Sequence, residues 1–307
     1  MPTGPTAPAT PTPAPIGETA DVGSKPWAVG VDDANGIVYT ANEAENTVTL
    51  LDIETLETIA TLAGGVGPSA VAVNPATGLA YITNAFSGDV TVIDGSTREV
   101  VTTIDTGDGP WDVAIDAQAN VIYVANSEAD TVSVIDGETN TVVDTIEDIE
   151  EPWGVAVGAG VLYVSSAAGG FVAVIDLTSG EVTGEIEVGD RPRGLTLDAE
   201  AGVLYVANVE DGTVSVIDVE AAEEITALDV ADLPLSVVLD AGGGRLYVAN
   251  SFDDSISVID TAAQETLATV RVGSRPWDVT LDVDGNVYAA LSGSSEVLRV
   301  APSELAP

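Results

Sequence analysis

Residues 110–136 read PWDVAIDAQANVIYVANSEADTVSVID, and this stretch decides the fold. Short runs in which Val and Ile alternate with small or polar residues are typical of β-strands whose sheets stack face to face. We place strands at Trp111–Asp116, Val121–Ala125 and Thr131–Ile135, and a fourth at roughly Thr141–Ile146. Turn-forming residues separate them, and no segment of the chain shows a sustained helical period.

The same unit recurs seven times along the 307 residues, and its clearest marker is a tyrosine in the second strand. Successive tyrosines are separated by 42, 42, 40, 42, 42 and 41 residues. They are Tyr39, Tyr81, Tyr123, Tyr163, Tyr205, Tyr247 and Tyr288. Seven units of four short strands predict an all-β protein, a seven-bladed β-propeller of four-stranded antiparallel blades, in preference to a sandwich.

The two ends of the chain are predicted to meet in the last blade. After Val300 only APSELAP remains, which is too short and proline-rich to supply a fourth strand. The segment ETADVGSKP at 18–26 aligns with GEIEVGDRP at 184–192, which ends the fourth unit. We therefore expect a strand near Thr19–Val22 to close the ring. The chain then divides into a Pro/Thr-rich tail or linker at 1–16, the propeller at 17–301 and a C-terminal tail at 302–307.

Loop lengths vary at one place in the repeat. The tyrosine precedes the end of the third strand by 13 residues in every unit, and that position precedes the next proline by 16 residues in all six cases. Only the distance from proline to tyrosine changes, from 13 to 11 in the fourth unit and 12 in the last. Catalytic propellers usually build asymmetric pockets from inserted loops. This uniformity therefore predicts that the protein is not an enzyme.

The chain is strongly acidic, with 50 acidic and 8 basic residues and a formal net charge of −42. Repulsion disfavours nucleic acid and anionic membranes as partners, and no apolar run is long enough to span a membrane. Adaptation to high salt and a compositional bias of the source lineage explain the acidity about equally well, and specific cation binding explains it less well. The absence of Cys and His removes the commonest metal ligands and the commonest general base.

The YVAN and VSVID segments, with GxxPWxV before them, resemble the YVTN family of β-propellers over residues 18–300. Members are typically exported or attached to prokaryotic cell surfaces, some within surface-layer proteins. The resemblance therefore implies an extracellular or cell-surface location, and it implies little about activity. The sequence departs from the pattern at Ser166 and Leu291, which replace the Asn that ends the second strand. It also departs at Ala301, which replaces the Asp that ends the third strand in the other units.

Two sets of residues recur near the start of the first strand. Exposed tryptophans there could stack on a sugar or anchor a partner, although we favour wedging of each against its neighbouring blade. The tryptophans are Trp27, Trp111, Trp153 and Trp277. The cations of the same loops could bind an anion, although we favour local pairing with acids such as Glu43, Glu45, Asp253 and Asp254. These cations are Lys25, Arg191, Arg193 and Arg275.

Acidic residues offer weaker candidates. Asp112 and Asp278 follow two of the tryptophans and could meet a cation in the channel, although a backbone hydrogen bond is the favoured interpretation. The D-x-D-G-N motif at Asp282, Asp284 and Asn286 resembles the opening of a calcium loop, but it lacks a distal bidentate Glu and fits a hairpin turn equally well. Cofactors are therefore expected to be absent, with Ca²⁺ as the one possible ligand. The recurring Asn and Asp at strand ends are interpreted as closing turns onto the backbone.

The sequence favours a non-enzymatic extracellular or cell-surface propeller that acts as a protein-interaction or structural scaffold. Its partner would be a protein or a cell-surface polymer, and its N-terminal tail could join copies into a homo-oligomer or array. The alternative is a metal-assisted lactonase- or lyase-like enzyme that uses Ca²⁺ or Mg²⁺ in the central channel. A metal bound near Asp112 and Asp278 would distinguish the two.

Overall fold

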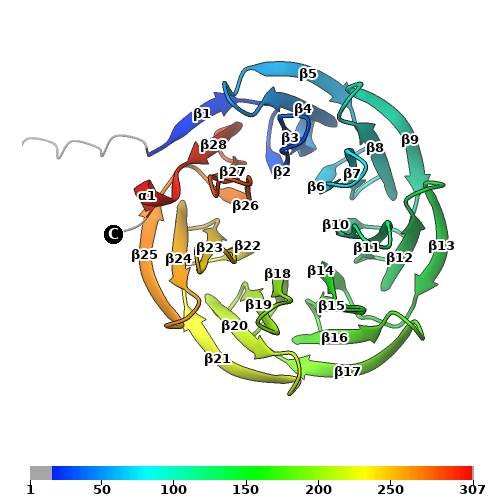
Figure 1. Ribbon diagram of the computed structural model, residues 1–307, viewed down its shortest axis with the longest axis vertical. Coiled ribbons are helices and arrows are strands. Elements are labelled where there is room, and N and C mark those ends of the chain that lie inside the picture. Colours follow the sequence, from blue (N-terminus) through cyan, green and yellow to red (C-terminus); the bar gives the residue numbers. More distant parts are fainter. Residues whose placement is uncertain (1–15, 306–307) are drawn as a thin grey trace, which may run out of the picture.

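The repeat folds into four consecutive antiparallel strands, and seven such blades are arranged around a central axis, which we call the channel, in the computed structural model, which describes residues 16–305 (Figure 1). The first strand of each blade lies at the channel, and in blades 1 to 7 these are β2 (Pro26–Asp32), β6 (Pro68–Asn74), β10 (Pro110–Asp116), β14 (Pro152–Gly158), β18 (Pro192–Asp198), β22 (Pro234–Asp240) and β26 (Pro276–Leu281). The predicted fold class is confirmed.

The second strands form the buried layer, because almost every residue in them is covered on both faces by neighbouring blades. They are β3 (Ile37–Asn42), β7 (Leu79–Asn84), β11 (Val121–Asn126), β15 (Val161–Ser166), β19 (Val203–Asn208), β23 (Arg245–Asn250) and β27 (Val287–Leu291). The third strands are β4 (Thr47–Asp52), β8 (Asp89–Asp94), β12 (Thr131–Asp136), β16 (Phe171–Asp176), β20 (Thr213–Asp218), β24 (Ser255–Asp260) and β28 (Glu296–Val300).

The fourth strands form the rim and are largely exposed, as in β13, where five of six residues face solvent. They are β5 (Thr58–Ala63), β9 (Glu99–Asp105), β13 (Thr141–Ile146), β17 (Glu181–Glu187), β21 (Glu223–Asp229), β25 (Glu265–Arg271) and, in blade 7, β1 (Glu18–Asp21). The hydrophobic core lies between adjacent blades, where Tyr123 and Val132 of blade 3 pack with Leu162 and Val164 of blade 4.

The ring closes as predicted, through an N-terminal strand in the last blade. β1 pairs antiparallel with β28, with Thr19 opposite Leu298 and Ala20 opposite Val297. The strand begins at Glu18, one residue before the expected start. After β28 the chain makes a short helix, α1 (Pro302–Leu305), and buries Leu305 against blade 7, so residues 302–305 pack on the propeller.

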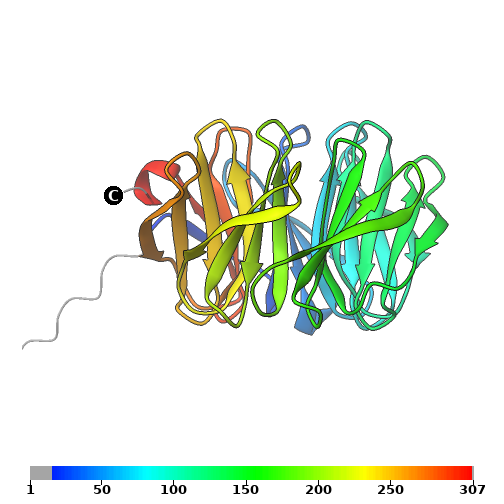
Figure 2. The same ribbon diagram turned by 90° about the horizontal axis from the view of Figure 1, so that it is seen from below.

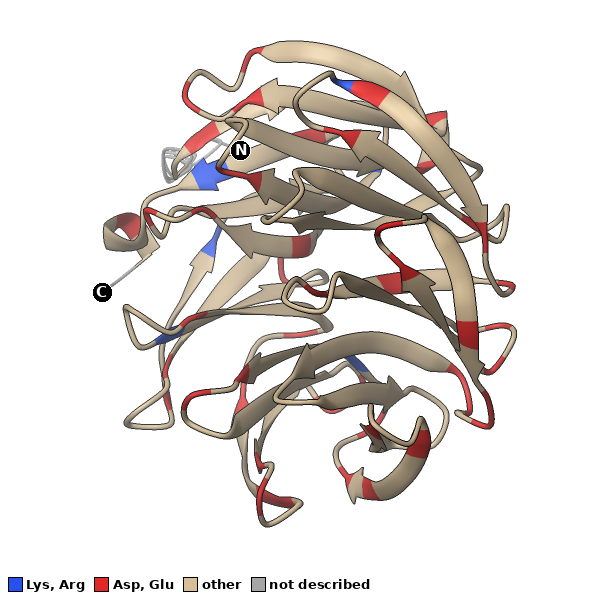
Figure 3. Ribbon diagram, turned by 45° about the vertical axis from the view of Figure 1, so that its right-hand side comes forward, with Lys and Arg blue, Asp and Glu red and all other residues tan. Residues whose placement is uncertain are grey.

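Seen from the side, the blades form a short cylinder with turns at both faces (Figure 2). One face carries the turns from strand 2 to strand 3 and from strand 4 to the next strand 1, and the two kinds of turn are hydrogen bonded, for example from the amide of Ser127 to the carbonyl of Gly109 at 2.8 Å. We call this the mouth face and the other the opposite face. Acidic side chains are scattered over all blades, whereas basic ones are few (Figure 3).

The recurring polar residues at strand ends have two different roles. Asp136 accepts hydrogen bonds from the amides of Glu138 and Thr139 at 2.7 and 3.1 Å, which closes the turn onto the backbone. The interpretation holds only in part for the Asn position. Asn84 Oδ1 accepts from the amide of Gly65 in the adjoining turn at 3.0 Å, whereas the Nδ2 of Asn126 donates to the hydroxyls of Thr131 and Ser133 at 3.1 and 2.9 Å. Because the amide is fully buried between strands, its Nδ2 meets side chains of the neighbouring strand.

Candidate functional site

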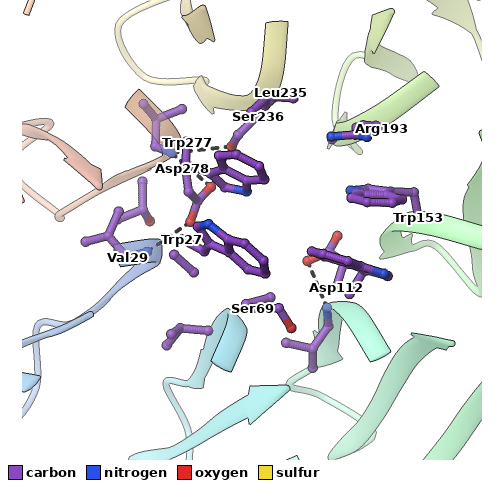
Figure 4. Close-up of a pocket in the computed structure, with 18 of the residues that line it drawn as sticks. Trp27, Val29, Ser69, Asp112, Trp153, Arg193, Leu235, Ser236, Trp277 and Asp278 are labelled. Carbon is purple, nitrogen blue, oxygen red and sulfur yellow. Dashed lines mark hydrogen bonds between the residues drawn. The ribbon is translucent and has the colours of Figure 1, made fainter. Parts of the chain in front are cut away.

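The first strand of each blade is interrupted directly after its proline. In β10 the pairing with β11 shifts register between Pro110 and Asp112, so Trp111 falls in a β-bulge. Bulges re-aim side chains, and here the bulge lies at the channel end of the blade. Because the same shift occurs in all seven blades, the side chains after the seven prolines gather at one mouth of the channel (Figure 4).

Four of the gathered side chains are tryptophans that stack on one another. The ring centroids of Trp111 and Trp153 are 4.3 Å apart with planes 18° from parallel. Trp27 stacks on Trp111 at 5.4 Å and on Trp277 at 5.2 Å. The Cζ of Arg193 lies 3.9 Å from the ring centre of Trp153 and caps one end by a cation–π contact. We call these five residues the tryptophan arc.

The contact of each tryptophan with a neighbouring blade, favoured from the sequence, is made through the neighbour's own tryptophan in the pairs Trp111–Trp153 and Trp277–Trp27, and the stacking of Trp27 on Trp111 across blade 2 was not expected. Blade 2 carries Ser69 at the equivalent position, and this small side chain leaves room for Trp27 and Trp111 to meet across it. Each stacked pair adds about 0.5–1.5 kcal/mol beyond the burial of its area. The indoles are partly buried, and the edge of Phe86 packs against Trp27 with ring centroids 6.1 Å apart.

The arc lines a cavity at the channel mouth with a volume of about 230 Å³. Polar groups converge on it from five blades, namely Ser69, Asp112, Arg193, Ser236 and Asp278. Pockets for drug-sized ligands are usually about 300–1,000 Å³. The cavity therefore has room for one side chain or one sugar ring, and a larger partner would rest on its rim.

Asp112 faces the cavity and also joins two blades. Its Oδ1 accepts a hydrogen bond from the amide of Val113 at 2.8 Å, and its Oδ2 accepts one from the amide of Val155 in blade 4 at 3.0 Å. Burial raises the pKa of Asp112 to about 7, the two amides oppose the rise, and the charge of Asp278 adds to it. The backbone hydrogen bond favoured from the sequence is present within the blade, and a second one crosses the blade boundary.

Asp278 makes the corresponding contacts at the closure of the ring. Its Oδ2 accepts from the amide of Val29 in blade 1 at 3.0 Å, and its Oδ1 accepts from Ser236 Oγ in blade 6 at 2.6 Å and from the amide of Val279 at 2.9 Å. Burial raises the pKa of Asp278 to about 6, against the lowering effect of these donors. The carboxylate therefore connects blades 6, 7 and 1.

Metal ligands are sparse in the part of the chain that the structure describes. Residues 16–305 contain no group of three or more acidic side chains placed to hold a metal ion. In the D-x-D-G-N motif, Asp282 Oδ1 accepts from the amides of Asp284 and Asn286 at 3.0 and 2.8 Å, and its Oδ2 accepts from the side chains of Asn286 and Tyr288. The motif thus forms a closed hairpin turn, and the acids that line the cavity are Asp112 and Asp278.

The four loop cations have different partners. Lys25 Nζ lies 3.4 Å from Glu43, one of the acids named from the sequence, and Arg191 lies 3.4 Å from Glu210 and 4.0 Å from Glu151. Arg193 stacks on Trp153, and burial lowers its pKa to about 10. Arg275 contacts Asp254 through its backbone amide at 2.9 Å. The structure therefore brings only Arg193 into the same site as the tryptophans.

Comparison with known proteins supports the fold and adds one functional hint. A family model described as a seven-bladed β-propeller lactonase matches residues 29–159, which is less than half of the chain. The chain is similar to lactonase propellers over its first three blades. Hydrazine synthase of Kuenenia stuttgartiensis superposes with a TM-score of 0.82 over 97% of this chain and 99% of that chain, at 20% identity, which shows the shared fold alone.

No curated protein matches the chain. The resemblance to the YVTN family stays a prediction. Among the described residues no helix has the length and apolar character required to cross a membrane.

Several exposed apolar side chains on the mouth face were not singled out from the sequence. Phe86 and Phe252 occupy the same position in the turns of blades 2 and 6, two residues after the buried Asn, and are 57% and 72% exposed. Val66 and Leu233 lie in the preceding 4-to-1 turns of these blades and are also exposed. The sequence feature that could have identified these residues is an aromatic side chain within an otherwise polar turn, where folding does not require one.

Proposed function

We propose that this propeller is a non-catalytic binding and scaffold protein of the cell surface or extracellular space, which takes a protein or a cell-surface polymer on its mouth face. The tryptophan arc carries the proposal. All 4 tryptophans of the chain lie in it. The equivalent position is occupied by Ser69 in blade 2 and by Leu235 in blade 6. Tryptophan and arginine are the residues most enriched where binding energy concentrates.

The chemistry of the cavity supports binding over catalysis. Both of its carboxylates already accept amide hydrogen bonds from neighbouring blades, and burial raises the pKa of both, so protons compete with a metal for them as the pH falls. A metal-assisted lactonase- or lyase-like reaction is the second candidate. The lactonase family model supports it, since the matched residues 29–159 include Asp112.

Retention of the protein on intact cells of its source tests the binding proposal. The chain supplies a matched replacement, because Leu235 occupies the arc position in blade 6. We expect the variant Trp153→Leu/Trp277→Leu to lose retention by roughly tenfold, as for the loss of central contact residues. The control Val283→Ser changes an exposed side chain on the opposite face and should leave retention unchanged. Equal retention of all three proteins would refute a binding role for the arc.

Hydrolysis of an aliphatic and an aromatic lactone in the presence of Ca²⁺ or Mg²⁺ tests the catalytic alternative. We expect no turnover above that of the variant Asp112→Asn/Asp278→Asn. Metal-dependent turnover that this variant loses would establish the enzyme and overturn the non-catalytic proposal.

Self-assembly is a separable part of the proposal, and the N-terminal tail that would mediate it lies outside the described residues except for Ile16. Light scattering of the full chain and of a variant without residues 1–15 distinguishes the possibilities. Assembly that is lost on deletion would support joining through the tail, whereas an unchanged assembly state would remove it from the proposal.

A further inference from the structure

Two turns of the mouth face are joined by an ion pair in blade 5, and blade 6 has apolar residues at the two equivalent positions. In blade 5, Arg191 precedes the first-strand proline, and it pairs with Glu210, the second residue after the buried Asn. In blade 6 the two equivalent positions are Leu233 and Phe252. Since blade 5 folds with charged residues at both places, the propeller itself does not require apolar ones.

Both apolar side chains face solvent. Phe252 is 72% exposed and Leu233 is 37% exposed. Leu233 shares a left-handed backbone with the equivalent residue of every other blade, and in blade 5 the charged Arg191 adopts it with a φ of 53°. The turn therefore does not require an apolar side chain, and an exposed leucine beside an exposed phenylalanine has no evident role in folding.

Leu233 and Phe252 form one wall of a cleft between blades 5 and 6 whose volume is about 470 Å³. We call it the rim cleft. Its lining residues are Val209, Glu210, Asp211, Gly212, Asp232, Leu233 and Phe252. Of its three acids, Glu210 pairs with Arg191, and Asp211 accepts a hydrogen bond from the amide of Asp190 at 2.7 Å. The cleft is thus apolar on one side and predominantly negative on the other.

We propose that the rim cleft docks a segment of a protein partner in which an apolar side chain is flanked by Lys or Arg. The apolar side chain would pack on Phe252 and Leu233, and the basic groups would face Glu210, Asp211 and Asp232. A second copy of this chain is disfavoured as occupant, because it has the same formal charge of −42 and only 8 basic residues. The inference rests on the proposed function only in that the partner is a protein bound on the mouth face.

Calorimetric titration of the full chain with three synthetic peptides tests the inference. The first peptide has a central Leu-Phe pair flanked by two basic residues on each side, the second has Ser in place of Leu-Phe, and the third has Ser in place of the basic residues. We expect saturable binding of one copy of the first peptide only. Equal binding of the second peptide would show attraction by charge alone and overturn the inference.

The double variant Leu233→Arg/Phe252→Glu provides the matched control, because it copies the ion pair of blade 5 into blade 6 and so preserves the turn. We expect it to weaken binding of the first peptide by roughly tenfold or more. Phe86→Ala removes another exposed phenylalanine of the mouth face and should leave the affinity unchanged. Unchanged affinity in the double variant, or an equal loss in Phe86→Ala, would overturn the inference.

Tryptophan emission separates this site from the arc, because no tryptophan lines the rim cleft and the peptides contain none. We expect the first peptide to bind without a change in emission, and to bind Trp153→Leu/Trp277→Leu as it binds the natural chain. Binding that changes the emission and is lost in this variant would place the peptide on the arc, which would overturn the rim cleft while leaving the proposed function intact.

Discussion

At the scale of single residues, the most informative groups are the two aspartates that face the channel. Asp112 and Asp278 follow a tryptophan in the bulge of the first strand, and each accepts an amide hydrogen bond from the next blade. The other blades have small residues at this position. Asp112 and Asp278 thus join neighbouring blades, and burial raises the pKa of both carboxyl groups.

The pKa values of Asp112 and Asp278 predict how stability depends on pH. Their pKa values rise from 3.8 to about 7 and about 6, so the folded protein binds more protons than the unfolded chain between these values. The free energy of unfolding contributed by each group is thus fully present below about pH 4 and is lost as the pH rises through its folded pKa. In Asp112→Asn this loss should shrink by roughly 1–3 kcal/mol.

Urea unfolding of the natural chain and of Asp112→Asn between about pH 4 and about pH 8 measures how the free energy of unfolding of each depends on pH. Subtracting one profile from the other cancels the contributions of the remaining carboxylates. The Oδ1 of the new Asn can still accept from the amide of Val155, so the blades stay joined. Parallel pH profiles for the two proteins would contradict the assigned role of burial.

Within the arc, the number of stacked neighbours predicts the cost of removing an indole. Trp111 stacks on two tryptophans and Trp277 on one. Trp111→Ala should therefore destabilise the protein by about 1 kcal/mol more than Trp277→Ala, because it loses one more stacked pair in addition to the buried area that both variants lose. Urea unfolding gives this difference, and the coupled circular dichroism of the indoles should weaken in the same order. An equal effect at both positions would indicate separate wedging.

At the scale of strands, the closure of the ring depends on four residues of β1. Deletion of residues 1–22 removes β1 and leaves the edge of β28 unpaired, and an open edge of this kind also promotes aggregation. We expect a loss of more than about 3 kcal/mol in the free energy of unfolding, beyond the usual range for point substitutions. Deletion of residues 1–15 keeps β1 and should have no effect on unfolding.

A peptide of residues 16–23, added to the longer deletion, should restore part of the lost stability by pairing with β28. Denaturant unfolding with and without the peptide checks this. If the two deletions are equally stable, the ring does not need its N-terminal strand.

The strands were predictable and the arc was not, for a physical reason. The alternation in Val121–Ala125 is local, and the repeat supplies seven independent copies of it, so the observed β11 (Val121–Asn126) differs by one residue. The direction of Trp111 depends on a bulge and on side chains from blades 1, 2 and 4, none of which a single repeat specifies. All four tryptophans lie at one mouth of the channel because they share one repeat position.

At the scale of the whole molecule, the dominant feature is charge. A formal charge of −42 on 307 residues favours expansion of the chain, and this repulsion is screened over about 10 Å at 0.1 M salt but over about 3 Å at 1 M. We expect the thermal midpoint to rise by several degrees between these salt concentrations. A midpoint that is independent of NaCl would show that acidic groups are too dispersed to oppose folding, and would favour compositional bias as their origin.

Under the proposed function, partners bind on the mouth face, which has the arc at its centre and exposed aromatic residues toward its rim. The uniform blades supply rigidity, since every described blade carries four strands and no blade inserts a long loop. Binding on such a face requires little rearrangement of the propeller.

Titration of the natural chain with purified cell-envelope polymer and protein fractions of its source, followed by intrinsic tryptophan emission, tests the central claim most directly. All 4 tryptophans lie in the arc, so the emission reports on that site alone. We predict a saturable change in emission, abolished in Trp153→Leu/Trp277→Leu, with the bound material recovered chemically unaltered. Saturable binding that leaves the emission unchanged, or conversion of the bound material to a product, would contradict the claim.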